Sequence, residues 1–141
     1  MIKEIKEDLD IAINLIWNVF MEFEAPNYTQ EGIDEFRDSI FNKEWVSKKK
    51  FYGYYDNDKL VGVIATNDVN HISLLFVDGN YHKQGIGRSL YNYIKRFNNT
   101  GYFNVNSSIY GHGFYKRIGF VDISEEQCVH GIRFYPMRID L

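Results

Sequence analysis

Hydrophobic positions along this chain follow two periods, and the change between them separates a helical part from a strand-rich part. The first part carries apolar side chains at the helical spacing of three and four, in two groups separated by Pro26. The first group is Ile13, Ile16, Trp17, Phe20 and Phe23, and the second is Ile33, Phe36, Ile40 and Phe41. From residue 51 onward, short apolar and β-branched runs alternate with polar turns, which is typical of strands.

The same pattern sets the bounds of the expected elements. It predicts strands over residues 2–5, 51–55, 60–66, 71–77, 102–105, 120–123 and 132–139, with the apolar run at 72–77 buried on both faces. It predicts helices from Asp8 or Asp10 to residue 23, from an N-cap at Thr29 to residue 41, and over 86–97 and 110–118. The polar stretch 42–50 is expected to be a connection. This order predicts an α/β fold, a single domain over 1–141 with a mixed central β-sheet flanked by helices.

Composition narrows the class of protein. The chain has 141 residues, of which 45% are hydrophobic and 25% charged, as expected for one globular domain. Its net charge of −3 argues against a nucleic-acid partner. No apolar run is long enough for a membrane span and no signal peptide is expected. The single cysteine, Cys128, excludes an internal disulfide and favours a cytoplasmic location. The four histidines lack metal-ligand spacing, so we expect no metal.

The strongest local signal joins the run at 71–77 to the following helix through a glycine-containing loop. Gly85 and Gly87 near the start of the helix would let an anion approach unpaired backbone amides, and Lys83 and Arg88 add positive charge. A dinucleotide-binding fingerprint fails because position 90 is Leu, and the NTPase phosphate loop fails on its Lys and its glycine spacing. The alternative is a tight strand-to-helix turn without a ligand.

Two segments together resemble a known family. They are Y-H-K-Q-G-I-G-R-S-L at 81–90 and F-Y-K-R-I-G-F at 114–120. In this order and separation they resemble the GCN5-related N-acetyltransferase superfamily, whose acetyl-coenzyme A loop reads R/Q-x-x-G-x-G/A. The resemblance covers nearly the whole chain, because the order of predicted elements also matches that fold.

The resemblance implies a site for acetyl-CoA beside the strand at 71–77. That strand separates from its neighbour in the superfamily and its backbone holds the pantetheine arm, which implies contacts from Leu75 and Val77. Asn106 and Ser108 are implied to border the pantetheine. The pyrophosphate is implied to bind the amides of His82, Lys83, Gln84, Gly85, Ile86, Gly87 and Arg88. His82 replaces the usual Arg or Gln, in a loop that works through its backbone.

Catalytic roles follow from the same resemblance. Tyr115 matches the tyrosine that lies near the cofactor sulfur and can protonate the departing thiolate; the alternative is a core aromatic beside Phe114. His71 lies near the place where many relatives have an acidic base. It is expected either to take the proton of the amine, directly or through water, or to be a hydrogen-bonded histidine at a strand end. The sequence leaves open whether His71, a glutamate or water removes that proton.

The first two helices and their link usually cover the acceptor groove in this fold, which implies that Glu22, Glu24 and Tyr28 contact the substrate. The expected function is transfer of acetyl from acetyl-CoA directly to a primary amine of a small molecule or peptide, without a covalent acetyl-enzyme. The alternative is a non-catalytic module that senses acyl-CoA. A homodimer formed through the strands at 120–123 and 132–139 is a further expectation, by analogy with relatives.

Overall fold

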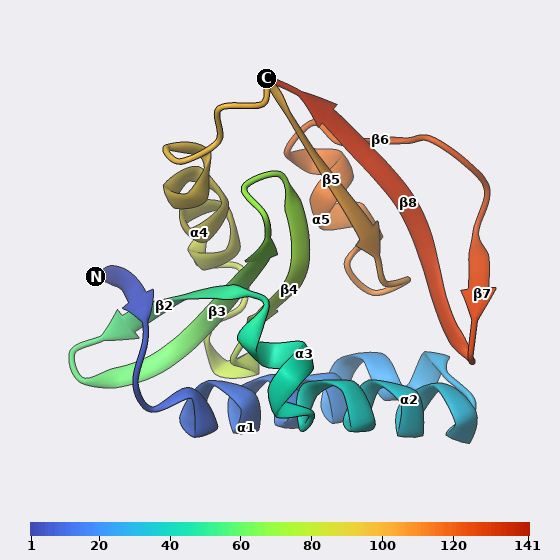
Figure 1. Cartoon of the computed structure of the whole chain (residues 1–141), viewed down its shortest axis with the longest axis horizontal. Helices are drawn as coiled ribbons and strands as arrows, with labels where there is room; N and C mark the ends of the chain where they lie inside the picture. The colour runs from blue at the N-terminus through green and yellow to red at the C-terminus, as the bar shows by residue number, and fades with distance from the viewer.

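A computed structural model describes all 141 residues, and its centre is one mixed sheet (Figure 1). The sheet has eight strands in the order β1-β2-β3-β4-β5-β8-β6, with β7 paired to β8. All neighbours are antiparallel except β4 and β5, which are parallel. The strands are β1 Ile2–Ile5, β2 Lys50–Asp56, β3 Lys59–Asn67, β4 His71–Val77, β5 Tyr102–Ser107, β6 Val121–Asp122, β7 Gln127–Val129 and β8 Ile132–Asp140.

Helices cover both faces of this sheet and create two separate cores. The helices are α1 Leu9–Val19, α2 Gln30–Ile40, α3 Lys43–Ser47, α4 Ile86–Lys95 and α5 His112–Arg117, with short turns η1 Phe20–Glu24, η2 Ala25–Asn27 and η3 Gly79–Tyr81. Ile16 and Phe20 of the first helical segment pack with Val63 in one core, whereas Leu90 of α4 packs with Ile64 in the other. Because β3 contributes alternate residues to both cores, it is apolar along its whole length. The mixed α/β fold predicted from the sequence is therefore confirmed.

Strand β4 contains the irregularity that shapes the rest of the molecule. Its register with β3 pairs Ala65 with Leu74 and Thr66 with Ile72, so Ser73 is an extra, unpaired residue. Such a bulge reverses which face the following side chains point to. Ile72 accordingly lies in the core beneath α4 and α5, and Leu74 lies in the core beneath α1 and α2. We expected this strand to be buried on both faces. That expectation is wrong for Ser73, Leu75 and Val77, whose side chains are only partly buried.

Strand β4 separates from β5 soon after the two strands meet. Only His71 with Asn104 and Ile72 with Val105 are paired between them. On its other side, β5 pairs with β8 along its whole length, from Tyr102 to Ser107. The far half of β4 therefore has a neighbour on one side only, and a wedge-shaped gap opens between the two parallel strands.

Several element bounds differ from the sequence expectation for local physical reasons. The stretch 42–50 is not only a connection: it contains α3, whose N-cap Asn42 accepts a hydrogen bond from the Trp45 amide at 3.0 Å. The first helix does not continue regularly to Phe23, because its last turn widens into the π-helical η1. Cys128, which lies outside every predicted element, is on β7. The N-cap expected at Thr29 is confirmed, since its hydroxyl accepts from Gly32 at 3.5 Å.

The β7–β8 hairpin reaches across the molecule to α2 (Figure 1). Its two-residue turn, His130 and Gly131, has φ of 51° and 79°, the left-handed geometry that closes tight hairpins. A Cβ on Gly32 of α2 would lie 2.2 Å from the Gly131 carbonyl oxygen, so only glycine permits this approach. The hairpin and α2 thus form two walls of one compartment. No helix of the chain is both long and apolar enough to cross a membrane.

Candidate functional site

A cleft of about 980 Å³ begins in the gap between β4 and β5 and continues toward α2, α3 and the β7–β8 hairpin. One end is lined by the loop that precedes α4, including Gly85 and Arg88. The other end is lined by Trp45 and Lys49, next to the start of β2. The cleft therefore connects the predicted cofactor loop with the face of the sheet that α1 and α2 cover elsewhere.

The edge of β4 presents backbone groups to this gap. The Asp78 amide donates to the Val61 carbonyl of β3 at 2.8 Å, so the amide of Asp78 faces β3. Successive residues of a strand direct their backbone groups to opposite sides, so the N–H and C=O of Val77 face away from β3, into the gap. Those of Leu75, two residues earlier, do the same. The structure thus places the backbone of both predicted pantetheine contacts along the cleft.

The loop before α4 is shaped to expose amides. Lys83 and Gly85 both have left-handed backbones, with φ of 63° and 80°, and no atom lies within 4 Å of where a Cβ of Gly85 would be. The first intrahelical hydrogen bond runs from the Ser89 amide to the Gly85 carbonyl, so the amides of residues 86–88 have no partner within the helix. Together with the helix dipole and Arg88, they form a site suited to an anion such as a phosphate.

His82 uses its imidazole to join three parts of the site. Its Nε2 donates to the Val77 carbonyl at 2.7 Å, because a carbonyl oxygen only accepts. This leaves Nδ1 to accept the Tyr110 hydroxyl at 3.3 Å. The ring also packs against Phe23 of η1, with centroids 4.6 Å apart, and Phe23 stacks on Tyr110 at 5.3 Å. The end of β4, the segment before α2 and the loop before α5 are therefore connected through one side chain.

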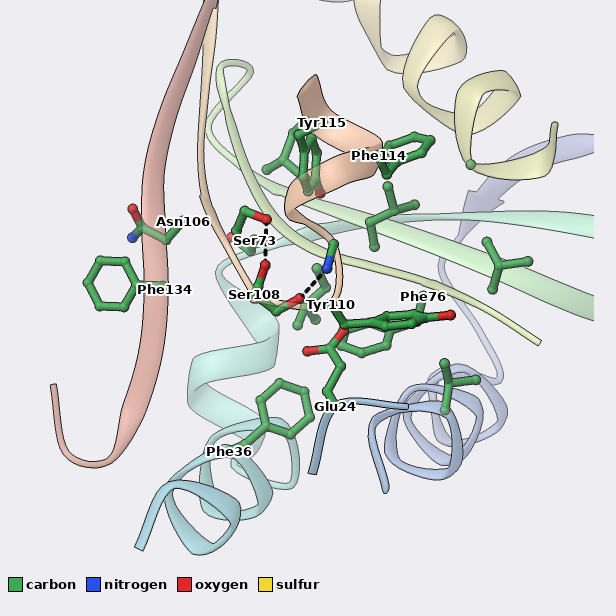
Figure 2. Close-up of a pocket in the computed structure, with 18 of the residues that line it drawn as sticks. Glu24, Phe36, Ser73, Phe76, Asn106, Ser108, Tyr110, Phe114, Tyr115 and Phe134 are labelled. Carbon is green, nitrogen blue, oxygen red and sulfur yellow. Dashed lines mark hydrogen bonds between the residues drawn. The ribbon is translucent and has the colours of Figure 1, made fainter. Parts of the chain in front are cut away.

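Tyr115 and Glu24 reach the cleft from opposite sides (Figure 2). Tyr115 is 6% exposed and makes edge-to-face contacts with Phe114 and Phe120 at 5.3 and 5.2 Å. Burial, with a smaller contribution from the negative charge of Glu24, raises the pKa of the Tyr115 hydroxyl. The phenol therefore stays protonated at neutral pH and is available as a hydrogen-bond donor.

Glu24 ends η1 and projects toward Ser108 and Tyr110 (Figure 2). Protein atoms surround its carboxyl group on most sides, although the residue keeps some contact with the solvent in the cleft. Burial raises the pKa of Glu24 to about 7, and hydrogen bonding with Ser108 offsets part of the shift. A carboxyl group with a pKa near neutrality exchanges protons readily at physiological pH.

The other residues expected at the substrate end are placed differently. Glu22 lies outside the cleft against η3, since a Cβ on Gly79 would be 2.9 Å from its Oε1. Tyr28 lines the cleft and donates its hydroxyl to the Arg133 carbonyl at 3.3 Å. Of the three residues expected to contact substrate, Glu24 and Tyr28 are brought together and Glu22 is not.

His71 and the residues after β5 also line the cleft. The Nδ1 of His71 is hydrogen-bonded to Asn104 Oδ1, so Nδ1 carries the proton and Nε2 is free. Asn106 and Ser108 line the cleft from the β5 side, and the Ser108 hydroxyl accepts the Gly111 amide at 2.9 Å. No group of three His, Cys, Asp or Glu side chains is arranged to hold a metal ion.

Comparison with known proteins agrees with this geometry. A family model described as an acetyltransferase (GNAT) domain matches residues 24–141, which contain both walls of the cleft. The chain belongs to the GNAT acetyltransferase family. No curated protein sequence matches the chain significantly.

Solved GNAT structures share the fold at low sequence identity. A GCN5-related N-acetyltransferase from Rhodopseudomonas palustris aligns with a TM-score of 0.87 at 15% identity, covering 100% of this chain and 95% of that one. The PaiA N-acetyltransferase from Thermoplasma acidophilum, solved with coenzyme A, has a TM-score of 0.76 at 18% identity, covering 100% and 99%. An aminoglycoside 6′-N-acetyltransferase, also solved with coenzyme A, has a TM-score of 0.64 at 13% identity, covering 99% and 96%.

Sequence reasoning on this GNAT chain missed three features of the cleft. The bridge from Tyr110 to the imidazole of His82 was not foreseen, because the two residues lie 28 positions apart and only the fold brings them together. Lys49 was placed in a solvated connection, yet it lines the cleft. Ser73 carried a readable signal, since it is the one polar residue inside the apolar run of β4.

Proposed function

We propose that this GNAT enzyme, acting as one domain over residues 1–141, transfers acetyl from acetyl-CoA directly to a primary amine of a small molecule or peptide. One observation carries the proposal: Glu24 and Tyr115 approach the cleft from opposite sides at the gap between β4 and β5 (Figure 2). A group that accepts a proton and a group that donates a hydrogen bond are thus positioned on either side of a single reacting centre. The free cysteine favours a cytoplasmic setting.

The residues of the cofactor end fit acetyl-CoA. The open space at Gly85, the unpaired amides of residues 86–88 and the charge of Lys83 and Arg88 suit a pyrophosphate. The backbone of Leu75 and Val77 suits the amide groups of a pantetheine arm. His82 and Gln84 contribute their backbone, and Asn106 and Ser108 form the opposite wall. The cofactor supplies an activated acetyl thioester and a thiolate leaving group.

Glu24 is the best placed group to take the proton of the amine. An amine must be neutral to attack a carbonyl, and a base with a pKa near 7 is efficient at neutral pH. Glu24 has that pKa and also carries the charge that attracts a cationic amine. His71, whose Nε2 is free, is the second candidate, acting directly or through water. The two roles are separable by substitution.

Two donors stabilise charge on the other side of the reaction. The Val77 amide, facing the gap, is placed to donate to the thioester oxygen as it gains negative charge, an effect worth about 3 kcal/mol in comparable sites. The Tyr115 hydroxyl is placed to donate to the departing sulfur. Its raised pKa makes complete proton transfer to a thiolate uphill, so hydrogen bonding supplies most of its effect. Cys128 does not line the cleft, which supports direct transfer over a covalent acetyl-cysteine.

Thiol release tests the proposal. The protein is incubated with acetyl-CoA and a panel of primary amines, free thiol is followed, and the acetylated amine is identified by mass spectrometry. We expect thiol release that depends on the amine and one acetylated product for each coenzyme A formed. Binding of acetyl-CoA without release on any amine would contradict the proposal and favour the sensor alternative.

A further inference from the structure

The cleft contains two buried polar atoms without partners. Asn67 Oδ1, at the end of β3, and Ser73 Oγ, at the bulge of β4, are both buried and make no hydrogen bond. Both residues line the cleft. Since nearly all buried polar groups in native proteins are hydrogen-bonded, two orphaned groups in one cleft point to a ligand that completes them.

Lys49 belongs to the same group of side chains. Lys50, the first residue of β2, pairs with Thr66, and Asn67 pairs with His71, so Lys49 and Asn67 each lie next to the end of the β2–β3 ladder. Partners across neighbouring strands lie on the same face of a sheet. Asn67 and His71 are thus neighbours across β3 and β4, Lys49 directly precedes β2, and Ser73 lies two residues further along β4; all four line the cleft. We call Lys49, Asn67 and Ser73 the distal polar cluster.

Lys49 lacks a negative partner. Its Nζ lies 3.5 Å from the centre of the Trp45 ring and 3.4 Å from the Trp45 carbonyl oxygen, and it makes no ion pair. Burial, followed by the charge of Lys48, lowers the pKa of Lys49. The other cation at this end, Arg133, is neutralised by Glu126 at 2.9 Å.

The remaining charged groups do not neutralise Lys49. Glu35 of α2 also lines the cleft but is exposed and makes no ion pair, and Glu24 lies toward Tyr115 at the transfer end. The compartment therefore has a carboxyl group where the amine reacts and an unpaired cation at the opposite end. Its charge distribution is complementary to a ligand with an amine at one end and an anion at the other.

We propose that the acceptor is an amino carboxylate, with its reacting amine at Glu24 and its carboxylate held by the distal polar cluster. Lys49 supplies the positive charge and the Ser73 hydroxyl donates a hydrogen bond. The orphaned Asn67 Oδ1 only accepts, so Asn67 binds the carboxylate through its NH₂ with the side-chain amide turned by 180°. A second ammonium in place of the carboxylate would face the charge of Lys49 and bind less well. This inference rests on the proposed function, because it assumes that amines react at Glu24.

Matched acceptors test the charge preference. Linear ω-amino acids of two to six carbons are compared with alkylamines and diamines of the same length, through kcat/KM for thiol release from acetyl-CoA. We expect the best ω-amino acid to exceed its alkylamine by at least tenfold and its diamine by more. In Lys49→Glu this order should reverse in favour of the diamine, and in Lys49→Met it should level out. Lys50→Glu, the same charge change on an exposed neighbouring residue, should keep the wild-type order.

A second measurement separates failure of the inference from failure of the proposed function. Calorimetric titration of the same ω-amino acids into protein saturated with coenzyme A detects binding where no transfer can occur. Binding that is lost in Lys49→Glu and kept in Lys50→Glu supports the inference even if no amine reacts, which would contradict only the proposed function. Equal kcat/KM for ω-amino acids, alkylamines and diamines, or an unchanged order of the three in Lys49→Glu, would overturn the inference alone.

Discussion

At the scale of single residues, burial gives Glu24 and Tyr115 opposite tasks. Burial disfavours the charged form of both groups and raises both pKa values. For Glu24 this brings the pKa to about 7, where a carboxylate accepts protons efficiently. For Tyr115 it keeps the hydroxyl protonated. Two acids of different strength are therefore poised as a proton acceptor and a hydrogen-bond donor by the same physical effect.

Replacing Tyr115 by phenylalanine removes the donor and keeps the ring contacts with Phe114 and Phe120. We expect kcat to fall roughly 10- to 100-fold, because the charge on the departing sulfur loses its hydrogen bond. The KM for acetyl-CoA should change less than threefold, since the substitution leaves the cofactor contacts in place. Steady-state kinetics at saturating amine checks this, and an unchanged kcat would remove Tyr115 from the reaction.

Replacing Glu24 by glutamine should separate the two candidate bases. We expect the wild-type kcat/KM to rise with pH to a plateau, with a midpoint near the Glu24 pKa of about 7. Glu24→Gln should lose this limb and at least tenfold in rate, whereas His71→Gln should keep the limb. The reverse pattern would assign the base to His71.

Glu24→Gln, which should lower the rate of transfer, should raise the free energy of unfolding. Folding raises the pKa of Glu24 from its ordinary value of 4.5 to about 7, so the folded state holds a proton that the unfolded state has released between these pH values. The free energy of unfolding of the wild type therefore falls as pH rises from 4.5 to 7. Glu24→Gln should be more stable than wild type by roughly 1–2 kcal/mol at pH 8 and equal to it at pH 4. Urea unfolding at both pH values checks this.

At the scale of elements, the single bulge in β4 does more than any helix to form the site. The extra residue Ser73 rotates the strand, and the pairing with β5 ends immediately before it. Without the bulge, β4 and β5 could continue as an ordinary parallel pair, and the N–H of Val77 would be satisfied within the sheet. The cleft is therefore a consequence of strand register.

His82 should act on cofactor affinity through the loop that it holds. His82→Phe keeps a ring against Phe23 but removes the donor to the Val77 carbonyl and the acceptor for Tyr110. We expect the affinity for acetyl-CoA to fall about fivefold, the worth of a hydrogen bond of ~1 kcal/mol that orders the loop before binding. Tyr110→Phe, which removes only the longer bond, should change affinity less than twofold. Equal affinity in His82→Phe would contradict this role.

The elements that the sequence predicted correctly are those with a strong period or a local signature. The helix beginning at residue 86 and the strands β2 and β3 follow directly from apolar spacing and polar turns. The five residues of α3 are too few to show a helical period. Strand β7 forms because a left-handed turn at His130 and Gly131 folds it onto β8. The bulge at Ser73 depends on the register with β3, which no local pattern contains.

The candidate site divides in the same way. The loop at 82–88 and Tyr115 could be found from the sequence, because phosphate binding and the resemblance both leave local signatures. Glu24 was recognised as a contact of the acceptor, but its raised pKa comes from burial, which hydrogen bonding with Ser108 only partly offsets, and could not be predicted. The placement of Lys49 and Asn67 at the same end of the β2–β3 ladder likewise requires the sheet.

At the scale of the whole molecule, the late strands leave little backbone for pairing with a second copy. Strand β8 pairs with β5 from Tyr135 to Asp140 and with β6 and β7 on its other side, so much of the backbone that the expected dimer would use is already paired. The remaining edge at β6 is short but carries the exposed apolar side chains Val121 and Ile123. A dimer formed through these late strands would therefore rely on side chains of this edge.

The account as a whole rests on one claim, that the gap between β4 and β5 binds acetyl-CoA with its pyrophosphate at the start of α4. Calorimetric titration with acetyl-CoA tests this most directly, using Gly85→Glu and Gly101→Glu as a matched pair. Both glycines have left-handed backbones, with φ of 80° and 86°, and open space around them, so both substitutions impose similar strain and charge. Only Gly85 lines the cleft. The account predicts one binding site per chain in the wild type and in Gly101→Glu, and no measurable binding in Gly85→Glu. Equal affinity in the two variants, or no binding by the wild type, would contradict it.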